Sequence, residues 1–419
     1  MNYEFSTLGA IIGMIIAIVL IIRQVKPAYS LIFGALIGGI IGSGDLVLTV
    51  DTMVNGSQSM ISSVLRIMTS GILAGCLIKT GAAEKIAEVI VTKLGEKRAV
   101  IAIALATMII CSVGVFIDIS VITVAPIALA IGKKAGYNKA SLLLAMIGGG
   151  KAGNIISPNP NTIAVSEAFN VNLTSLMYRN LIPAIFALIA TVFLASFLAK
   201  KNSATVNEED VEKGGSRNLP SFLQAVAGPV VVVILLALRP LFSIAIDPLI
   251  ALPLGGLICA LCCGDIKNFK AYTAFGLSKV IDVSILLIGT GTIAGIIKAS
   301  ALQYDVIHIL EMMNMPAFIL APAAGILMAG ATASTTAGAT IAAQTFSAPL
   351  LASKIPALSA GAMIHAGATV IDSLPHGSFF HATGGAANMN IKERMKLIPY
   401  EACIGLVSTI ASVIMYIVL

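Results

Sequence analysis

Charged residues are scarce in this chain of 419 residues. Asp, Glu, Lys and Arg together make up 11% of the sequence, whereas about 25% is usual for a soluble domain. Hydrophobic residues make up 58%, and apolar segments of about 20 residues, the length that crosses a bilayer, fill almost the whole chain. This composition excludes a soluble globular protein and predicts a polytopic protein whose main partner is the lipid bilayer.

Signatures of several other protein classes are missing as well. No cleavable signal peptide is expected, because residues 1–6 lack a basic region and residues 8–22 resemble a first span. No nucleophile–base pair or metal-ligand set stands out, which argues against an enzyme and against a cofactor. There is no Gly-x-x-x-x-Gly-Lys-Ser/Thr loop, which argues against an ATP-driven pump. No repeated pore-lining helix or ring motif indicates a channel.

The six cysteines and the histidines do not form a convincing metal site. Cys259, Cys262 and Cys263 are spaced like metal ligands, but no second Cys/His pair accompanies them, so small core residues are the better interpretation. The histidines at 365, 376 and 381 have no Glu-x-x-His or Cys partner. The net charge of +6 comes from loops and does not indicate a nucleic-acid partner.

The most informative stretch is residues 148–161, which read Gly-Gly-Gly-Lys-Ala-Gly-Asn-Ile-Ile-Ser-Pro-Asn-Pro-Asn inside an apolar helical pattern. Proline lacks the backbone donor and clashes with the preceding turn, and glycine weakens a helix further. Freed backbone groups in hydrocarbon must be satisfied by protein or by a water-filled cavity. An interrupted helix of this kind indicates the central site of a transporter. The alternative is a kinked helix whose glycines serve close packing.

Residues 1–200 contain a series of predicted membrane elements. We expect spans at about 5–22, 29–47 and 57–80, an amphipathic segment at 82–98, a hairpin at about 99–132, a broken helix at about 139–167 and a span at 180–199. The hairpin is interrupted at 111–120, and each of its flanks is too short to cross the membrane. A re-entrant hairpin therefore suits this segment.

Residues 201–220 are a hydrophilic linker, and residues 221–419 repeat the order of the first half. A second hairpin is expected at about 316–352, interrupted at 330–338, and a second broken helix at about 357–388. Recurring motifs are Gly38-Gly39 with Gly255-Gly256, Gly71 and Gly75 with Gly291 and Gly295, and Leu181-Ile182-Pro183 with Leu397-Ile398-Pro399. Their offsets of 217, 220 and 216 residues are nearly constant. The chain is therefore predicted to be an internal duplication.

The number of crossings predicts how the two halves are related. Three spans, a broken helix and a final span give five crossings in each half, because the hairpin does not cross. An odd number inverts the second half relative to the first. With this topology, 20 of the 26 Lys and Arg residues, Arg394 among them, fall on one side and 4 on the side of the N-terminus, with Arg66 and Lys151 inside spans. The positive-inside rule then places both termini outside an inner (plasma) membrane.

Three ionisable residues inside the predicted membrane segments are the main functional candidates, because a charge there is costly without a partner. Lys151, in the first broken helix, would attract an anionic substrate together with the positive ends of half-helices, or would pair with Asp118 or Asp372 only to neutralise charge. Asp118 and Asp372 lie in the first hairpin and the second break. Either carboxyl group could carry a coupling proton, or form an ion pair or a helix cap.

Uncharged polar residues at the same interruptions complete the candidate substrate site. They are Asn154, Ser157, Asn159 and Asn161 in the first break, Ser334, Thr335 and Thr336 at the second hairpin tip, and His376 and Ser378 in the second break. The amides suit polyhydroxylated ligands, and the hydroxyls would hold substrate oxygens or satisfy local backbone. His376 suits a proton relay or a hydrogen bond to substrate. Arg66 would be a second anion contact or a buried partner of Asp51.

These motifs resemble a known transporter family. Gly149-Gly150-Lys151 through Ser157-Pro158-Asn159-Pro160-Asn161, Phe116-Ile117-Asp118 before Pro126, and His-Ala-Gly-Ala-Thr at 365–369 are similar to the gluconate permease family. More broadly, the duplicated hairpin and broken helix resemble the ion transporter superfamily that includes the divalent anion symporters. The resemblance implies a homodimer, a scaffold domain, a transport domain that moves as an elevator, and proton-coupled import of sugar acids and related hydroxy acids.

Two departures from the family pattern keep other substrates and coupling ions open. The second hairpin tip, 331–338, contains no Asn, and the second break reads Leu-Pro-His-Gly at 374–377 in place of Pro-Asn. The sequence therefore predicts an all-α secondary transporter, built from two inverted repeats, that imports a small organic anion by proton symport. Alternatives are a sodium-coupled di- or tricarboxylate symporter and a sodium/proton exchanger that uses Asp118 and Asp372.

Overall fold

The computed structural model describes residues 4–201, 205–207, 210, 218–242, 244, 246–302, 304–305, 308, 312 and 316–418. Across these residues the regular structure is helical, apart from two isolated β-bridges, Phe5 with Ser300 and Asn138 with Thr205. A helix satisfies its backbone groups internally, which suits apolar segments that meet hydrocarbon. The sequence analysis is therefore confirmed in its expectation of an all-α protein.

The first half forms eleven α-helices within the described residues. They are α1 (Thr7–Ile22), α2 (Pro27–Ser43), α3 (Leu46–Gln58), α4 (Ile61–Lys79), α5 (Ala82–Leu94), α6 (Ala99–Ser112), α7 (Ile117–Ala135), α8 (Lys139–Asn154), α9 (Pro160–Ala168), α10 (Leu173–Arg179) and α11 (Leu181–Ala199). A short 3₁₀ turn, η1 (Glu96–Arg98), precedes α6.

The second half follows a similar order. Its described helices are α12 (Phe222–Phe242), α13 (Pro248–Cys262), α14 (Phe269–Ala299), α16 (Leu320–Thr332), α17 (Thr335–Ala352), α18 (Ala357–Gly367), α19 (Ser378–Ala386), α20 (Ile391–Met395) and α21 (Ile398–Val418), with 3₁₀ turns η3 (Ile266–Asn268) and η4 (Ala317–Ile319). Four described helical segments, 61–79, 181–199, 266–299 and 391–418, are long and apolar enough to cross a membrane by length and composition.

The third span differs in length from the sequence expectation. Helix starts at Leu46 rather than near residue 57, and α3 passes into α4 through Ser59 and Met60, whose backbones stay close to helical. Its counterpart in the second half, α14, is one continuous helix of 31 residues. The polar residues between 49 and 59 lower the hydropathy of this segment, so the hydropathy pattern does not identify it as helix, although its backbone is not interrupted.

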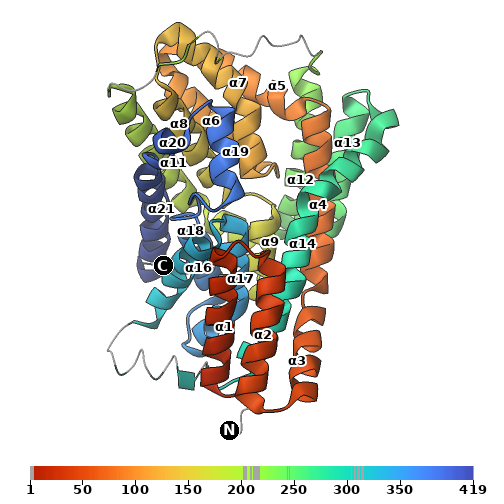
Figure 1. The fold of residues 1–419 in the computed structure, drawn as a ribbon. Coiled ribbons are helices and arrows are strands. Elements are labelled where there is room, and N and C mark those ends of the chain that lie inside the picture. The colour runs from red at the N-terminus through yellow and green to blue at the C-terminus, as the bar shows by residue number, and fades with distance from the viewer. Residues whose placement is uncertain are drawn as a thin grey trace.

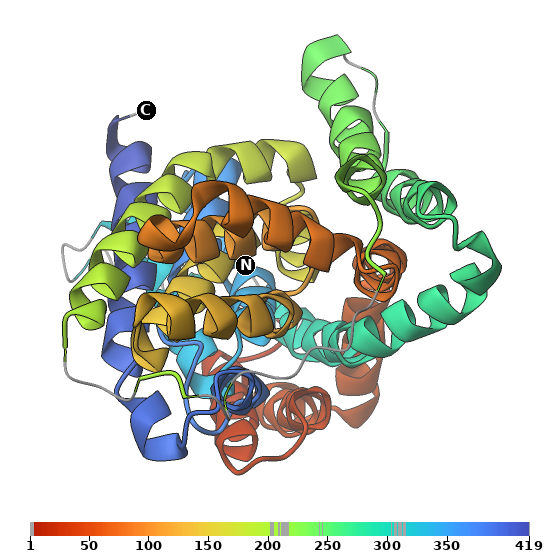
Figure 2. The same ribbon diagram turned by 90° about the horizontal axis from the view of Figure 1, so that it is seen from above.

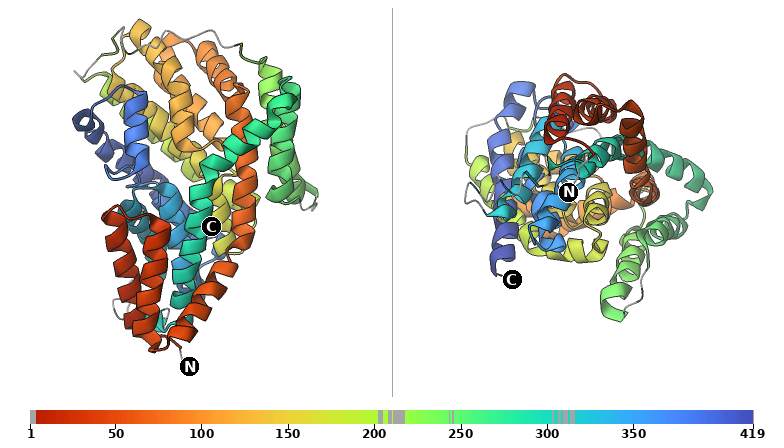
Figure 3. Two further views of the ribbon diagram at one scale, coloured as in Figure 1. Left: turned by 45° about the vertical axis from the view of Figure 1, so that its right-hand side comes forward. Right: turned by 90° about the horizontal axis from the view of Figure 1, so that it is seen from below.

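Glycine contacts bring α3 and α4 against α14 at two places. A Cβ built on Gly276 would overlap the carbonyl oxygen of Gly71, and one built on Gly56 would overlap that of Gly291. Gly56 and Gly276 are 220 residues apart, and so are Gly71 and Gly291. The two contacts are therefore the same contact with the halves exchanged. Figure 3 shows α4 and α14 as the long helices that lie together here.

The first helices of the two halves lie toward different ends of the molecule. In Figure 1, α1, α2 and α3 form the lower end, whereas α12 and α13 stand at the upper right beside α4. Seen from above, α12 and α13 project away from the remaining helices (Figure 2). The first hairpin, α6 and α7, stands at the upper end, as do α12 and α13, whereas α16, α17 and α18 lie lower, next to α1 (Figure 1).

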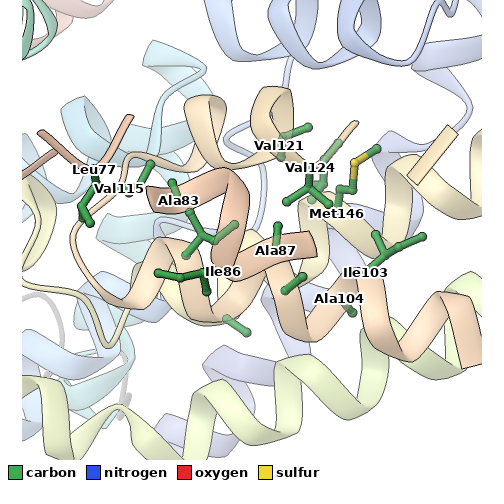
Figure 4. Packing of buried hydrophobic residues seen from close by; sticks show 14 of the residues in the cluster. Leu77, Ala83, Ile86, Ala87, Ile103, Ala104, Val115, Val121, Val124 and Met146 are labelled. Carbon is green, nitrogen blue, oxygen red and sulfur yellow. The ribbon is translucent and has the colours of Figure 1, made fainter. Parts of the chain in front are cut away.

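One apolar core includes residues of α5, α6, α7 and α8. Ile86 and Ala87 of α5, Ile103 of α6, Val121 of α7 and Met146 of α8 belong to one cluster of buried residues (Figure 4). All five side chains are buried. Burial of each large apolar side chain contributes roughly 1.5–3 kcal/mol in water. This packing fixes the positions from which α7 and α8 enter the centre of the protein.

Both hairpins turn within the interruptions that the sequence predicts, 111–120 and 330–338. Helices α6 and α7 are separated by residues 113–116, and α16 and α17 by residues 333–334. Ala333 has a φ of 46°, a left-handed conformation that usually favours glycine. Ser334 then caps α17 by accepting a hydrogen bond from the backbone N–H of Ala337 at 3.2 Å.

Candidate site between the broken helices

Lys151 lies at the centre of a buried polar cluster. Its side chain is 1% exposed, one turn before the end of α8, where the helix dipole favours a cation. Its Nζ donates to Oδ1 of Asp372 at 2.7 Å and to the carbonyl oxygen of Thr369 at 2.5 Å. A longer contact of 3.4 Å reaches the carbonyl oxygen of Glu401. Of the two partners that the sequence analysis weighed for Lys151, the structure selects Asp372.

Asp372 joins three elements through its two carboxylate oxygens. It lies between α18 and α19, in the second break, and its side chain is 1% exposed. Oδ1 accepts from Lys151 and from the hydroxyl of Ser373 at 3.1 Å. Oδ2 accepts from the hydroxyl of Thr335 at 2.6 Å. The second hairpin tip therefore contacts the carboxylate that neutralises Lys151.

Three asparagines of the first break form the other side of the cluster. The Nδ2 of Asn159 donates to Oδ1 of Asn154 at 2.6 Å, and the Nδ2 of Asn161 donates to the same oxygen at 3.0 Å. Thr336 donates its hydroxyl hydrogen to Oδ1 of Asn161 at 2.5 Å. Because Thr335 and Thr336 are neighbours on α17, one continuous set of residues results. We call it the central polar network: Lys151, Asn154, Asn159, Asn161, Thr335, Thr336 and Asp372.

Two helix N-termini meet at this network. Pro160 begins α9, where its missing N–H is not needed, and Oδ1 of Asn159 caps the helix by accepting from the backbone N–H groups of Asn161 and Thr162. Helix α17 begins at Thr335, and the bond from Thr336 to Asn161 joins the two starts. Helix N-termini carry partial positive charge and unpaired N–H groups, so their meeting favours an anion.

Unpaired polar atoms remain beside the network. Nδ2 of Asn154 and Oγ of Ser157 are buried without a hydrogen-bond partner among the described residues. Most buried polar groups in folded proteins are hydrogen-bonded. These two atoms therefore have capacity for a further polar group at the first break.

The remaining predicted residues lie around the network rather than in it. His376 contacts the carbonyl oxygen of Ala331 through Nε2 at 3.2 Å, which ties the second break to the second hairpin. Ser334 caps α17, and Ser378 is exposed at the start of α19. Asp118 is half-buried in the first turn of α7, and no hydrogen bond or ion pair joins it to the network within the described residues.

A second buried ion pair was not anticipated from the sequence. Arg394 of α20 pairs with Glu401 of α21, and both side chains are 1% exposed. The guanidinium also contacts the hydroxyl of Thr383 at 3.3 Å and lies over the ring of Phe380, 4.9 Å from its centroid. Arg394 occurs among the charges of residues 392–396, which is why the sequence placed it in a loop. The pair anchors α19 beside the carbonyl oxygen that Lys151 contacts.

The partner suggested for Arg66 was wrong. Arg66 of α4 binds Asp247 rather than Asp51, through Nε and Nη2 at 3.0 and 2.6 Å, and its Nη1 binds Glu167 at 2.7 Å. Asp247 caps α13, and Glu167 lies in the last turn of α9. Asp51 is exposed on α3. The partners are distant in sequence, so spacing alone could not identify them.

Comparisons with known proteins agree with the resemblance seen in the sequence. Residues 5–419 match the model of the GntP family permeases. An uncharacterized transporter of Haemophilus influenzae is 54% identical over 98% of both chains. A gluconate permease of Bacillus licheniformis is 27% identical over 41% of this chain and 37% of its own.

A solved structure has a similar fold. The YdaH transporter of Alcanivorax borkumensis aligns with a TM-score of 0.65 at 15% identity, covering 90% of each chain. This likeness supports the arrangement of helices alone. Because the family model extends over nearly the whole chain, this protein belongs to the GntP family of permeases, integral membrane transporters rather than enzymes.

Proposed function

We propose that this protein imports a small organic anion, a sugar acid or a related hydroxycarboxylate, by proton symport. The anion would bind at the central polar network, and a proton would bind at Asp372. Support for the substrate class comes from the gluconate permease among the relatives and from the positive helix ends and amides at the first break. A sodium-coupled di- or tricarboxylate symporter is not favoured by the relatives.

The observation that carries the proposal is the buried pair of Lys151 and Asp372. The two groups, 2.7 Å apart, come from the two broken helices and are almost completely shielded from solvent. Buried ion pairs add little stability over apolar residues, because removing both charges from water is costly. Ionisable residues within membrane segments commonly mark substrate and proton pathways.

The same pair provides a way to couple the two ligands. While Asp372 is ionised, it neutralises Lys151, and a substrate carboxylate gains little attraction from the pair. When Asp372 takes a proton, the ammonium keeps its charge and attracts the anion. Each ligand therefore favours the binding of the other, which is reciprocal linkage. The proton and the anion would move together.

Asp372 is the better of the two candidate proton carriers. Its carboxylate contacts Lys151 and Thr335, whereas Asp118 lies outside the network. Asp118 is nevertheless close to it in the chain fold, because its neighbour Ile117 packs on Gly150, with 2.7 Å between Cγ1 and a Cβ built on that glycine. We assign Asp118 a structural role in the first hairpin.

The proposal includes two inverted repeats and elevator movement of a transport domain against a scaffold. The exchange-symmetric glycine contacts of α4 and α14 support the repeat relation, and the separation of α1 and α2 from α12 and α13 in Figure 1 is in keeping with it. Helices α1–α4 and α12–α14 would form the scaffold of a homodimer, and α6–α9 with α16–α19 the transport domain. Both termini would then face outward from the plasma membrane.

Uptake into proteoliposomes tests this function. Labelled gluconate, glycerate and citrate would be offered to the wild-type protein under an inward proton gradient and, separately, under an inward sodium gradient. We expect a hydroxy acid to accumulate with the proton gradient. Accumulation driven only by sodium would overturn the proton symport, and sodium-driven loss of a preset pH gradient without uptake of any acid would support the exchanger instead.

Variants of the pair test its role. Lys151→Met should abolish uptake, whereas Asp372→Asn should uncouple uptake from the proton gradient. Either change leaves a buried group unpaired, at a cost of roughly 3–5 kcal/mol, so thermal unfolding of the purified protein must accompany each assay. The double variant should regain stability without regaining proton-driven uptake. Proton dependence that persists in Asp372→Asn and disappears in Asp118→Asn would move the proton to Asp118.

A further inference from the structure

A second buried polar cluster lies against the first break, around two residues, His365 and Asn180, that the proposed function does not use. His365 of α18 is 0% exposed, and so is Asn180, which precedes α11. The Nδ2 of Asn180 donates to the carbonyl oxygen of Ile155 at 3.0 Å and contacts Nδ1 of His365 at 3.5 Å. Ile155 directly follows α8. The cluster therefore joins α18 and α11 to the residues that interrupt the first broken helix.

The hydrogen bonds determine which atoms of this cluster are unpaired. An amide nitrogen can only donate, so Nδ1 of His365 accepts, and the ring hydrogen of the neutral imidazole lies on Nε2. Nε2 of His365 and Oδ1 of Asn180 have no partner among the described residues. The first is an unpaired donor, and the second is an unpaired acceptor.

Two further unpaired atoms belong to the same break. Nδ2 of Asn154 is a donor, and the hydroxyl of Ser157 can donate or accept. Asn154 and Ser157 lie on either side of Ile155 in the sequence, whose carbonyl oxygen is the one held by Asn180. Together with Asn180 and His365, these two residues complete the second cluster. It presents donors together with one obligate acceptor, in a region shielded from solvent.

This combination distinguishes among ligand groups. A carboxylate only accepts hydrogen bonds, so it cannot satisfy Oδ1 of Asn180. An ammonium only donates, so it cannot satisfy Nε2 of His365 or Nδ2 of Asn154. A hydroxyl both donates and accepts, so it is a group that can satisfy either kind of atom.

We propose that His365 and Asn180 are specificity-determining residues that read a hydroxyl of the transported acid, while its carboxylate lies toward Lys151 and the N-termini of α9 and α17. This inference rests on the proposed function, since it assumes an organic acid at the central polar network. A site built to hydrogen-bond a hydroxyl rejects the analogue that lacks it, because its buried polar groups then stay unpaired. Acids without hydroxyls are therefore poor substrates.

Competition for uptake of labelled gluconate into proteoliposomes tests the inference. The competitors are unlabelled gluconate, 2-deoxygluconate and 3-deoxygluconate, which share the carboxylate and differ in one hydroxyl. Wild-type protein should favour gluconate over at least one deoxy acid by about tenfold or more. In His365→Phe and Asn180→Leu this ratio should fall close to one, through weaker binding of gluconate rather than tighter binding of the deoxy acid.

Two further variants separate recognition from folding. His365→Gln can place an amide donor near the position of Nε2 and should restore part of the ratio. Ser408→Ala removes another buried hydroxyl, on α21, which no hydrogen bond among the described residues joins to the first break, and it should leave the ratio unchanged. Size-exclusion chromatography identifies variants that fail to fold. If His365→Phe or Asn180→Leu is among them, the competition ratio of His365→Gln tests the inference.

The outcomes distinguish this inference from the proposed function. If wild-type protein takes up none of the acids tested, the proposed function fails, and the inference fails with it. If uptake occurs but gluconate and both deoxy acids compete equally in the wild type, or the ratio is unchanged in folded His365→Phe and Asn180→Leu, only the inference is overturned.

Discussion

Thr335 and Thr336 are consecutive residues of α17 whose hydroxyls bind different halves of the central polar network. Thr335 donates to Asp372 in the second break, and Thr336 donates to Asn161 at the start of α9. Successive residues of a helix point about 100° apart, so one helix start can contact both broken helices. The proton-binding and anion-binding parts of the proposed site therefore meet at a single hairpin tip.

Replacing each threonine by the isosteric valine should separate the two roles. Thr336→Val leaves Oδ1 of Asn161 without its donor, a loss of about 1–2 kcal/mol, so KM for the acid should rise roughly tenfold with its proton dependence intact. Thr335→Val leaves Oδ2 of Asp372 without the donor that Thr335 supplies and should reduce the ratio of uptake with and without the proton gradient. Initial rates in proteoliposomes over a range of acid concentrations and gradients measure both quantities.

Serine provides the control, since Thr335→Ser and Thr336→Ser keep the hydroxyls and should behave nearly as the wild type. If both valine variants changed KM and gradient dependence in the same proportion, the division of roles between the two residues would be wrong.

The sequence predicts much of the fold because the signals are local. Glycine, proline and asparagine interrupt helices through their own backbone chemistry, so the stretch 148–161 identifies itself without knowledge of its neighbours. The end of α8 at Asn154 and the start of α9 at Pro160 fall inside it. Intramembrane charge is likewise visible in one residue, which is why Lys151 and Asp372 could be chosen as candidates.

Which residues pair with one another and which are buried depend on tertiary contacts, so neither could be predicted from the local sequence. His365 has a motif around it but no spacing that points to Asn180. Arg394 follows Lys392 and Glu393 and has the sequence context of a loop, yet it is fully buried. Arg66 binds two carboxylates that are 101 and 181 residues away. Only the fold brings such residues together.

The Arg66 contacts predict a measurable link between three helices. Its side chain and those of Glu167 and Asp247 are 23%, 28% and 39% exposed, so solvent weakens each pair relative to a fully buried one. Glu167→Gln should lower the free energy of unfolding by about 1 kcal/mol, and Arg66→Ala by roughly 2–3 kcal/mol, because the guanidinium contacts with two carboxylates are then lost. Chemical denaturation of the protein in detergent gives these values.

Asp51 is the matched control for Arg66. Because this exposed carboxylate does not contact Arg66, Asp51→Asn should change the unfolding free energy by less than about 0.5 kcal/mol. A larger loss of unfolding free energy for Asp51→Asn than for Glu167→Gln would indicate that Asp51 is the partner of Arg66, as the sequence suggested. Glu167→Gln can also be combined with Asp247→Asn in one protein. Losses of unfolding free energy that are not additive would show that both carboxylates act through Arg66.

The linker between the halves is attached to the protein at Asp210. Lys139, at the start of α8, donates to Oδ1 of Asp210 at 2.6 Å and to the carbonyl oxygen of Asn388 at 3.2 Å. The backbone N–H of Asn207 donates to Oδ2 at 2.8 Å. Burial acts to raise the pKa of Asp210, but the bonds and charge from Lys139, Asn207 and Asn388 outweigh it and lower that pKa.

The direction of this shift sets the pH range in which the attachment holds. A carboxyl group whose pKa is lower in the folded protein stabilises it above the unfolded value, about 3.9, and this contribution is lost as the pH falls through the folded value. Attachment of the linker should therefore be constant between about pH 5 and 9. Pepsin, which is active in acid, should cut the linker faster only once the pH falls below about 4.

Asp210→Asn imitates the protonated carboxyl at neutral pH. Loss of the charge-assisted bond, about 1 kcal/mol, should raise the rate of tryptic cleavage in the linker roughly fivefold at pH 7.5. Glu88→Gln is the control, because it removes the partner of Lys85, 2.9 Å away on α5, from a pair with no hydrogen bond to the linker residues that the structure describes. Equal cleavage of the wild type and Asp210→Asn would mean that Asp210 does not hold the linker. A wild-type rate that already rises between pH 7 and 5 would contradict the lowered pKa.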